Sequence, residues 1–239
     1  MPRIPRTDVG GLVYHVLNRA NARAPLFDDE IDYRAFTELL AEERARAAMR
    51  LLAWCLMPNH WHLVLWPRAD GDLARFVRRL TQRHTQARHR RQGTAGQGHL
   101  YQGRYKAFLV QEDTHLVTVC RYVERNPLRA GLVASAADWP HGSPAQLRRR
   151  GAGRLLDPWP LPRPARWAEL VDRPETPQEL DGLRRSVRRG APFGAAAWRG
   201  AAAVGGRKAA ARRGAAPAAR PPGRPPRSGE EATGAQKES

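Results

Sequence analysis

The spacing of apolar residues changes several times along the first half of the chain, and each change predicts a new element of secondary structure. Short runs of β-branched and aromatic residues, typical of strands, alternate with longer stretches in which apolar residues recur with the period of an amphipathic helix. Strands are predicted at residues 11–19, 51–56, 60–66 and 101–110. Helices are predicted at residues 28–48 and 112–126, and another begins at Asp72.

This order, strand–helix–strand–strand–helix–strand–helix, predicts a βαββαβ domain. We expect a ferredoxin-like α+β fold, in which helices cover one face of an antiparallel sheet, and assign residues 1–135 to it. Recurrent prolines after Trp139 favour a small, loosely organised and mostly helical C-terminal appendage over residues 136–200, with helices at 165–172 and 177–189. Residues 201–239 have no apolar periodicity and are expected to form a disordered basic tail.

The strands at residues 51–56 and 60–66 predict a hairpin with a tight turn between them. Side chains alternate between the two faces of a strand, so His60 and His62 point the same way and Trp61 points the opposite way. Two imidazoles on one face of a rigid strand form half of a metal site. The alternative is a well-packed hairpin with no further role, because His-x-His pairs are common.

A helix later in the chain carries residues that suit the other half of such a site. Tyr122 and Asn126 lie four positions apart and therefore share a flank of the predicted helix. The imidazoles of His60 and His62 and the carbonyl oxygen of Asn126 would hold a divalent cation, and the Tyr122 oxygen would attack a phosphodiester. The open coordination positions of this ligand set favour Mg²⁺ or Mn²⁺ over a closed zinc site.

Each of these residues also has an ordinary structural interpretation. Tyr122 alone is a common residue of an amphipathic helix, and Asn126 is a common helix-end residue before a proline. Spacing along the chain does not show that this helix lies against the strand with the histidines.

The charge balance indicates a polyanionic partner. The chain of 239 residues has 41 basic and 23 acidic residues, a net charge of +18, and only three of the basic residues are lysines. Arginine suits phosphate groups, although a GC-rich genome also raises arginine content. The helix that begins at Asp72 is rich in arginine, with almost no acidic partner in its sequence, and the alternative is a solvated helix face. The candidates for DNA-backbone contacts are Arg75, Arg78, Arg79, Arg83, Arg104 and Lys106, with Arg19 a weaker one.

The cysteines and the apolar stretches indicate a soluble protein of the cytoplasm. Cys55 and Cys120 lie inside apolar runs and are expected to be buried thiols in a reducing compartment. We find no apolar leader segment and no window long enough to span a membrane.

Four segments together resemble a known bacterial family. Residues 11–19, Met57–Leu63, Tyr101–Lys106 and Tyr122–Val133 are similar to the REP-associated tyrosine transposases, which belong to the single-tyrosine HUH transposases. The resemblance extends over about residues 8–200 in the right order. It implies a ferredoxin-like catalytic domain in which His60 and His62 are the HUH pair, Tyr122 is the nucleophile and Asn126 is the third metal ligand.

The resemblance also implies an activity. Members of the family cleave single-stranded DNA near folded hairpins with Mg²⁺ or Mn²⁺, form a 5′-phosphotyrosine and rejoin strands without ATP. The expected partner is therefore DNA with REP-like hairpins, which the C-terminal appendage would also contact, and the chain would act as a monomer or homodimer. The alternatives are a non-catalytic regulator that binds DNA hairpins and, less favoured, an RNA-binding protein whose histidine pair is structural.

Overall fold

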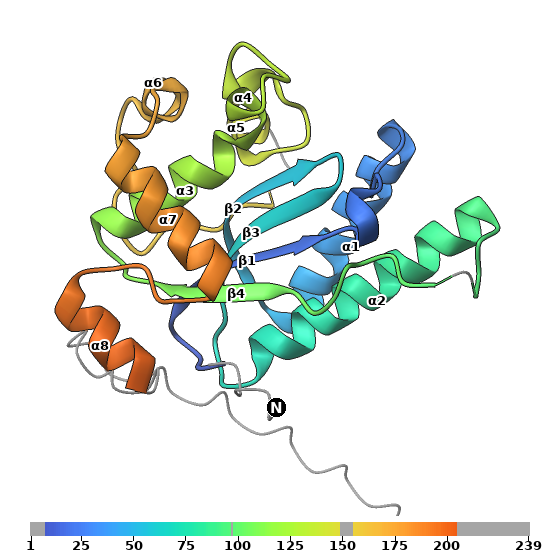
Figure 1. Cartoon of the computed structure of the whole chain (residues 1–239), viewed down its shortest axis with the longest axis horizontal. Coiled ribbons are helices and arrows are strands. Elements are labelled where there is room, and N and C mark those ends of the chain that lie inside the picture. The colour runs from blue at the N-terminus through green and yellow to red at the C-terminus, as the bar shows by residue number, and fades with distance from the viewer. Residues whose placement is uncertain (1–7, 97, 149–154, 205–239) are drawn as a thin grey trace, which may run out of the picture.

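Four strands form one antiparallel sheet in the computed structural model, which describes residues 8–96, 98–148 and 155–204 (Figure 1). They are β1 (Val13–Arg19), β2 (Arg50–Met57), β3 (His60–Trp66) and β4 (Lys106–Val110). Their order in the sheet is β2-β3-β1-β4, and each neighbouring pair is antiparallel. The predicted α+β fold with an antiparallel sheet is confirmed, and this order is the one that a βαββαβ chain produces.

Helices cover both faces of the sheet, so the prediction that they lie on one face is wrong. On one face, α1 (Glu30–Ala47) and α2 (Asp72–Gln92) enclose a first core that includes Trp61 and Leu63 (Figure 1). On the other face, α3 (Thr114–Glu124) packs over a second core that includes Val64 and Phe108. The second core exists because the strands are apolar on both sides.

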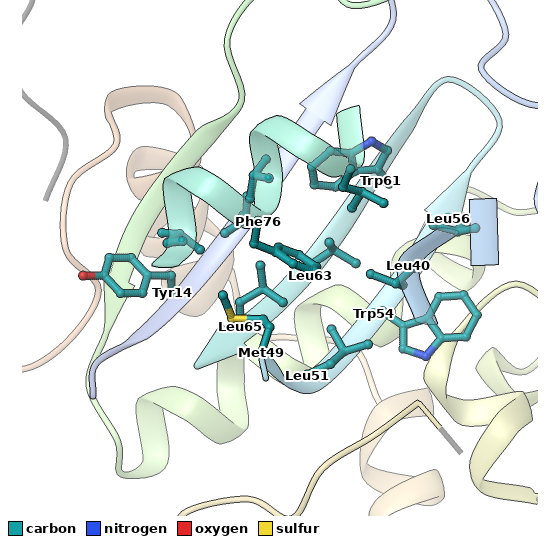
Figure 2. Close-up of a cluster of buried hydrophobic side chains, with 14 of the residues drawn as sticks. Tyr14, Leu40, Met49, Leu51, Trp54, Leu56, Trp61, Leu63, Leu65 and Phe76 are labelled. Carbon is teal, nitrogen blue, oxygen red and sulfur yellow. The ribbon is translucent and has the colours of Figure 1, made fainter. Parts of the chain in front are cut away.

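Figure 2 shows how the first core uses the pleat of the sheet. Trp61, Leu63 and Leu65 of β3 point into this core together with Tyr14 of β1 and Phe76 of α2. Trp61 is fully buried. Because successive residues alternate faces, the same pleat directs His60 and His62 towards α3.

Two predicted elements have different limits in the structure. The strand predicted at 101–110 is regular only from Lys106, because the side chain of Tyr101 is hydrogen-bonded to Trp61 and its backbone forms only an isolated bridge to Ala20. The helix predicted at 112–126 ends at Glu124, and a separate turn, α4 (Asn126–Arg129), follows it. The proline after Asn126 lies in the first turn of α4, where the missing amide hydrogen costs nothing.

The C-terminal segment is packed onto the domain, which contradicts the expectation of loose organisation. Its helices are α5 (Ser143–Arg148), α6 (Trp167–Asp172), α7 (Pro177–Arg189) and α8 (Ala196–Val204). A short 3₁₀ helix, η2 (Ala136–Asp138), precedes them, and another, η1 (Asn21–Arg23), follows β1. The helices predicted at 165–172 and 177–189 correspond to α6 and α7. Trp167, Val171 and Leu183 join the second core.

The same segment also covers the two edges of the sheet. Gly142 forms a bridge to Cys55 on the β2 edge, and Phe193 forms one to Val110 on the β4 edge. Of the predicted tail, residues 201–204 belong to α8, and residues 205–239 lie outside the described part of the chain. Within the described residues, no helix has both the length and the apolar character needed to cross a membrane.

Candidate active site

The structure brings the predicted histidine pair and the predicted tyrosine together on the α3 face of the sheet. The ring of Tyr122 lies nearly perpendicular to that of His62, with 6.1 Å between ring centres. The rings of His60 and His62 are 5.0 Å apart. A single chain therefore supplies both the strand with the histidines and the helix with the tyrosine.

Each histidine of the pair is oriented through one ring nitrogen. The Nδ1 atom of His60 is 2.7 Å from the side-chain oxygen of Asn59, and the Nδ1 atom of His62 is 2.8 Å from Nε2 of His15. The Nε2 atoms of His60 and His62 make no hydrogen bond to any described residue. A hydrogen bond from one ring nitrogen typically fixes the orientation of a metal-binding imidazole and leaves the other nitrogen for the metal.

The environment keeps these imidazoles uncharged near neutral pH. Burial of the ring, and to a smaller extent the positive charges of Arg19 and Arg129, lower the pKa of His60 to about 4. The pKa of His62 also lies well below its usual value, first because the ring is buried and then because imidazoles and guanidinium groups surround it. Burial lowers the pKa of His15 to about 3. Neutral imidazole is the form that ligates metal ions.

Asn126 lies beside Tyr122, but its amide is already hydrogen-bonded. Its Nδ2 group donates to the backbone oxygens of Tyr122 (3.2 Å) and Val123 (3.3 Å). Its Oδ1 atom accepts a hydrogen bond of 2.8 Å from Arg129. These three contacts determine which end of the amide is the oxygen. One lone pair of that oxygen stays available, because an amide oxygen has two.

The hydroxyl of Tyr122 makes no hydrogen bond to any residue that the structure describes. Two other tyrosines, Tyr101 and Tyr105, lie on the opposite face of the sheet. Tyr101 accepts a hydrogen bond from Trp61 (3.0 Å) and is 2.7 Å from Nδ1 of His84, and Tyr105 packs against the first core. The sheet therefore separates both Tyr101 and Tyr105 from the histidine pair.

The candidate DNA contacts differ in their surroundings. Arg19 is exposed and lies directly opposite His60 in the β1–β3 ladder, next to the candidate site. The premise that the arginines of α2 lack acidic partners is wrong, because Arg79 and Arg83 form ion pairs with Glu43, and Arg75 pairs with Asp72. Three exposed candidates make no ion pair with a described residue: Arg78, Arg104 and Lys106. That these residues contact the DNA backbone stays a prediction.

Three residues of this site were not predicted from the sequence: His15, Arg129 and Glu175. His15 lies on the same face of β1 as the histidine pair does on β3, and strand alternation would have shown this once the pairing of the strands was known. Arg129 lies one helical turn after Asn126, which is a detectable spacing. Glu175 has no sequence signal, because it reaches the site from the loop after α6.

No cluster of three or more His, Cys, Asp or Glu side chains suited to a metal ion exists among the described residues. A metal at this site would therefore have two imidazoles and an amide oxygen as its protein ligands. Such a set has no carboxylate and leaves several coordination positions for water or phosphate oxygens.

Comparisons with known proteins show similarity to transposases. Residues 8–126 match a family model described as "Transposase IS200 like". A putative REP-associated tyrosine transposase from Haemophilus influenzae is 30% identical over 101 residues, which cover 38% of this chain and 57% of that protein. The REP-associated tyrosine transposase of Escherichia coli is 23% identical over 133 residues, which cover 55% of this chain and 74% of that protein.

One solved structure shares the fold. It is described as a REP-associated tyrosine transposase bound to a REP hairpin, and its TM-score is 0.53 at 20% identity. The matched region covers 66% of this chain and 94% of that chain.

Proposed function

Because the chain belongs to the IS200-like transposase family, we propose that it is a metal-dependent nickase and strand transferase that acts on single-stranded DNA near hairpins. The observation that carries this proposal is the position of Tyr122 against His62 in one chain, 6.1 Å between ring centres. A tyrosine whose hydroxyl makes no hydrogen bond within the described part of the chain, next to two oriented, neutral imidazoles, suits phosphodiester cleavage better than it suits a structural core.

The cleavage step follows from the chemistry of tyrosine. The Tyr122 oxygen attacks the phosphorus of the scissile phosphodiester and loses its proton, and the bond from phosphorus to the 3′ oxygen breaks. The products are a 5′-phosphotyrosine and a 3′ oxygen that takes up a proton. The phosphotyrosine conserves the energy of the phosphodiester, so attack by a 3′-hydroxyl in the reverse direction rejoins strands without ATP.

The residues at the site fit a divalent cation. His60 and His62 would hold it through their Nε2 atoms, and Asn126 would add the second lone pair of its Oδ1 atom. We propose Mg²⁺ or Mn²⁺, which accept open sites with oxygen ligands completing the shell. When bound, the cation would polarise the phosphoryl oxygens and reduce the negative charge that repels the nucleophile.

The proposed DNA partner is a hairpin with single-stranded flanks. Support comes from the net charge of +18 and from the exposed Arg19 beside His60. The solved relative with the same fold was described in complex with a REP hairpin. Phosphate contacts of this kind would give affinity without sequence preference.

The proposal is tested with the full chain and hairpin oligonucleotides that carry a 3′-side label. We expect a covalent protein–DNA adduct on a denaturing gel with Mg²⁺ or Mn²⁺ and none after chelation with EDTA. Hairpin binding without an adduct in either metal would favour the non-catalytic regulator, and a preference for RNA of equal sequence would favour an RNA-binding protein.

His15 provides a separate test of the metal site. We expect His15→Leu to weaken Mn²⁺ binding by roughly 10- to 100-fold, because the ring of His62 loses the hydrogen bond that orients it. In His15→Gln, an amide can still bond to Nδ1 of His62, so most of the affinity should return. The measurement is isothermal titration calorimetry without DNA, with melting temperatures as a check on folding. Equal Mn²⁺ affinity in wild type and His15→Leu would exclude this role.

A further inference from the structure

Arg129 contacts both Tyr122 and Asn126, the two site residues that were predicted on a helix. Its guanidinium carbon lies 4.1 Å from the ring centre of Tyr122, in a cation–π contact. Its Nη2 group donates to the backbone oxygen of Tyr122 (3.1 Å) and to Oδ1 of Asn126 (2.8 Å). One planar side chain therefore fixes the face of the tyrosine ring and the direction of the asparagine oxygen.

A carboxylate from the C-terminal segment holds this guanidinium in place. The Nη1 group of Arg129 donates to Oε1 of Glu175 at 2.6 Å. The side chain of Glu175 is 1% exposed, and its other oxygen accepts a hydrogen bond of 3.3 Å from Arg125. Glu175 lies in the loop between α6 and α7, 46 positions after Arg129 in the chain.

Three arginines spaced four residues apart, Arg121, Arg125 and Arg129, bind this loop to α3 and α4. Arg121 donates to the backbone oxygen of Arg173 at 2.8 Å, and Arg125 and Arg129 share Glu175. Among the described residues, Arg121 and Arg125 form no hydrogen bond and no cation–π contact with the Tyr122 ring or the Asn126 side chain. Of the three arginines, Arg129 alone connects the loop to the candidate site.

We propose that Glu175 and Arg129 are positioning residues that set the orientation of Tyr122 and Asn126 for cleavage. The inference rests on the proposed function, and it assigns the segment at 136–200 a part in the active site as well as any contact with DNA. Stability alone is a weak explanation for the ion pair between Arg129 and Glu175, because a buried ion pair often adds no more to the free energy of unfolding than a hydrophobic pair of similar volume. Positioning is a stronger reason, because a nucleophile displaced by about 1 Å can lose 10²-fold in rate.

Single-turnover adduct formation tests the pair. Arg129→Lys keeps the charge but has no planar fork to span Tyr122, Asn126 and Glu175, and Glu175→Gln keeps the shape but removes the charge. We expect each substitution to lower the single-turnover rate by roughly 10- to 100-fold at saturating DNA, with hairpin affinity unchanged. Arg125→Lys is the matched control: it alters the longer contact of Glu175 (3.3 Å) and leaves the 2.6 Å contact between Glu175 and Arg129 in place, so it should retain the wild-type rate.

A second measurement separates positioning from general stability. If Glu175 acts through Arg129, then Glu175→Gln should lower the rate in the wild type but cause no further loss in an Arg129→Ala background. Melting temperatures of all variants are measured alongside.

Equal losses in both backgrounds, or a lower melting temperature with an unchanged rate, would overturn the inference. An equal loss of rate in Arg125→Lys would also overturn it, because the effect would then come from the ion-pair cluster as a whole. Absence of an adduct in the wild type would instead reject the proposed function. The two failures are therefore distinguishable.

Discussion

Tyr122→Phe is expected to abolish the covalent protein–DNA adduct and to leave hairpin binding intact. The substitution removes a single oxygen, and the remaining ring keeps its contacts with His62 and with the guanidinium of Arg129. The hydroxyl makes no hydrogen bond to a described residue, so its loss leaves no known partner unsatisfied. Loss of a covalent nucleophile costs on the order of 10⁶ in rate, which places the variant below detection in a gel assay.

Tyr101→Phe is the control for this experiment. Tyr101 lies on the opposite face of the sheet, bonded to Trp61 and near His84, so its substitution should affect stability before it affects cleavage. Adduct formation and electrophoretic mobility shift are measured for both variants with the same labelled hairpin. An adduct that persists in Tyr122→Phe, at the wild-type rate, would remove Tyr122 from the mechanism.

The histidine side of the site could be predicted from the sequence, and the reason is local. The alternation of a strand determines that His60 and His62 share a face, whatever the rest of the fold does. The position of Trp61 on the opposite face, fully buried under α1 and α2, confirms the predicted alternation. The limits of β3, His60–Trp66, were also predicted, because Pro58 and Pro67 bound the apolar run.

The proximity of the histidine pair to Tyr122 in the fold could not be derived from spacing along the chain. Helical periodicity places Tyr122 and Asn126 on one flank of the helix predicted at residues 112–126, but it does not say which face of the sheet that helix covers. The sequence of β2 does not distinguish the two faces, because every residue from Leu51 to Met57 is buried and the strand therefore has no polar side. The prediction of helices on one face failed for the same reason.

Long-range ion pairs account for the other differences. The arginines of α2 were expected to lack acidic partners, but Glu43 of α1 binds Arg79 and Arg83 across the helix–helix contact. Glu175 reaches Arg129 from far along the chain in the same way. Such pairs depend on tertiary packing, and a charge pattern within one helix does not reveal them.

Substitution of either histidine of the pair is expected to remove metal-dependent cleavage and to retain DNA binding. His60→Ala and His62→Ala each delete one of the two proposed imidazole ligands, and a bound metal ion would contribute several kcal/mol of transition-state stabilisation. We therefore expect the single-turnover rate to fall about 10³-fold or more in Mg²⁺ or Mn²⁺. Binding of Mn²⁺ in the absence of DNA, measured by calorimetry, should weaken in parallel.

His115→Ala is the matched control, because it removes an imidazole from α3 without touching the proposed ligands. His115 is 2.7 Å from a carboxylate oxygen of Asp113 and lies against Phe193, so its partners are outside the site. Its metal response should match the wild type. If His60→Ala and His62→Ala kept both the wild-type rate and the wild-type Mn²⁺ affinity, the histidines would be structural. The orienting contacts of Asn59 and His15 would then serve only the packing of the hairpin.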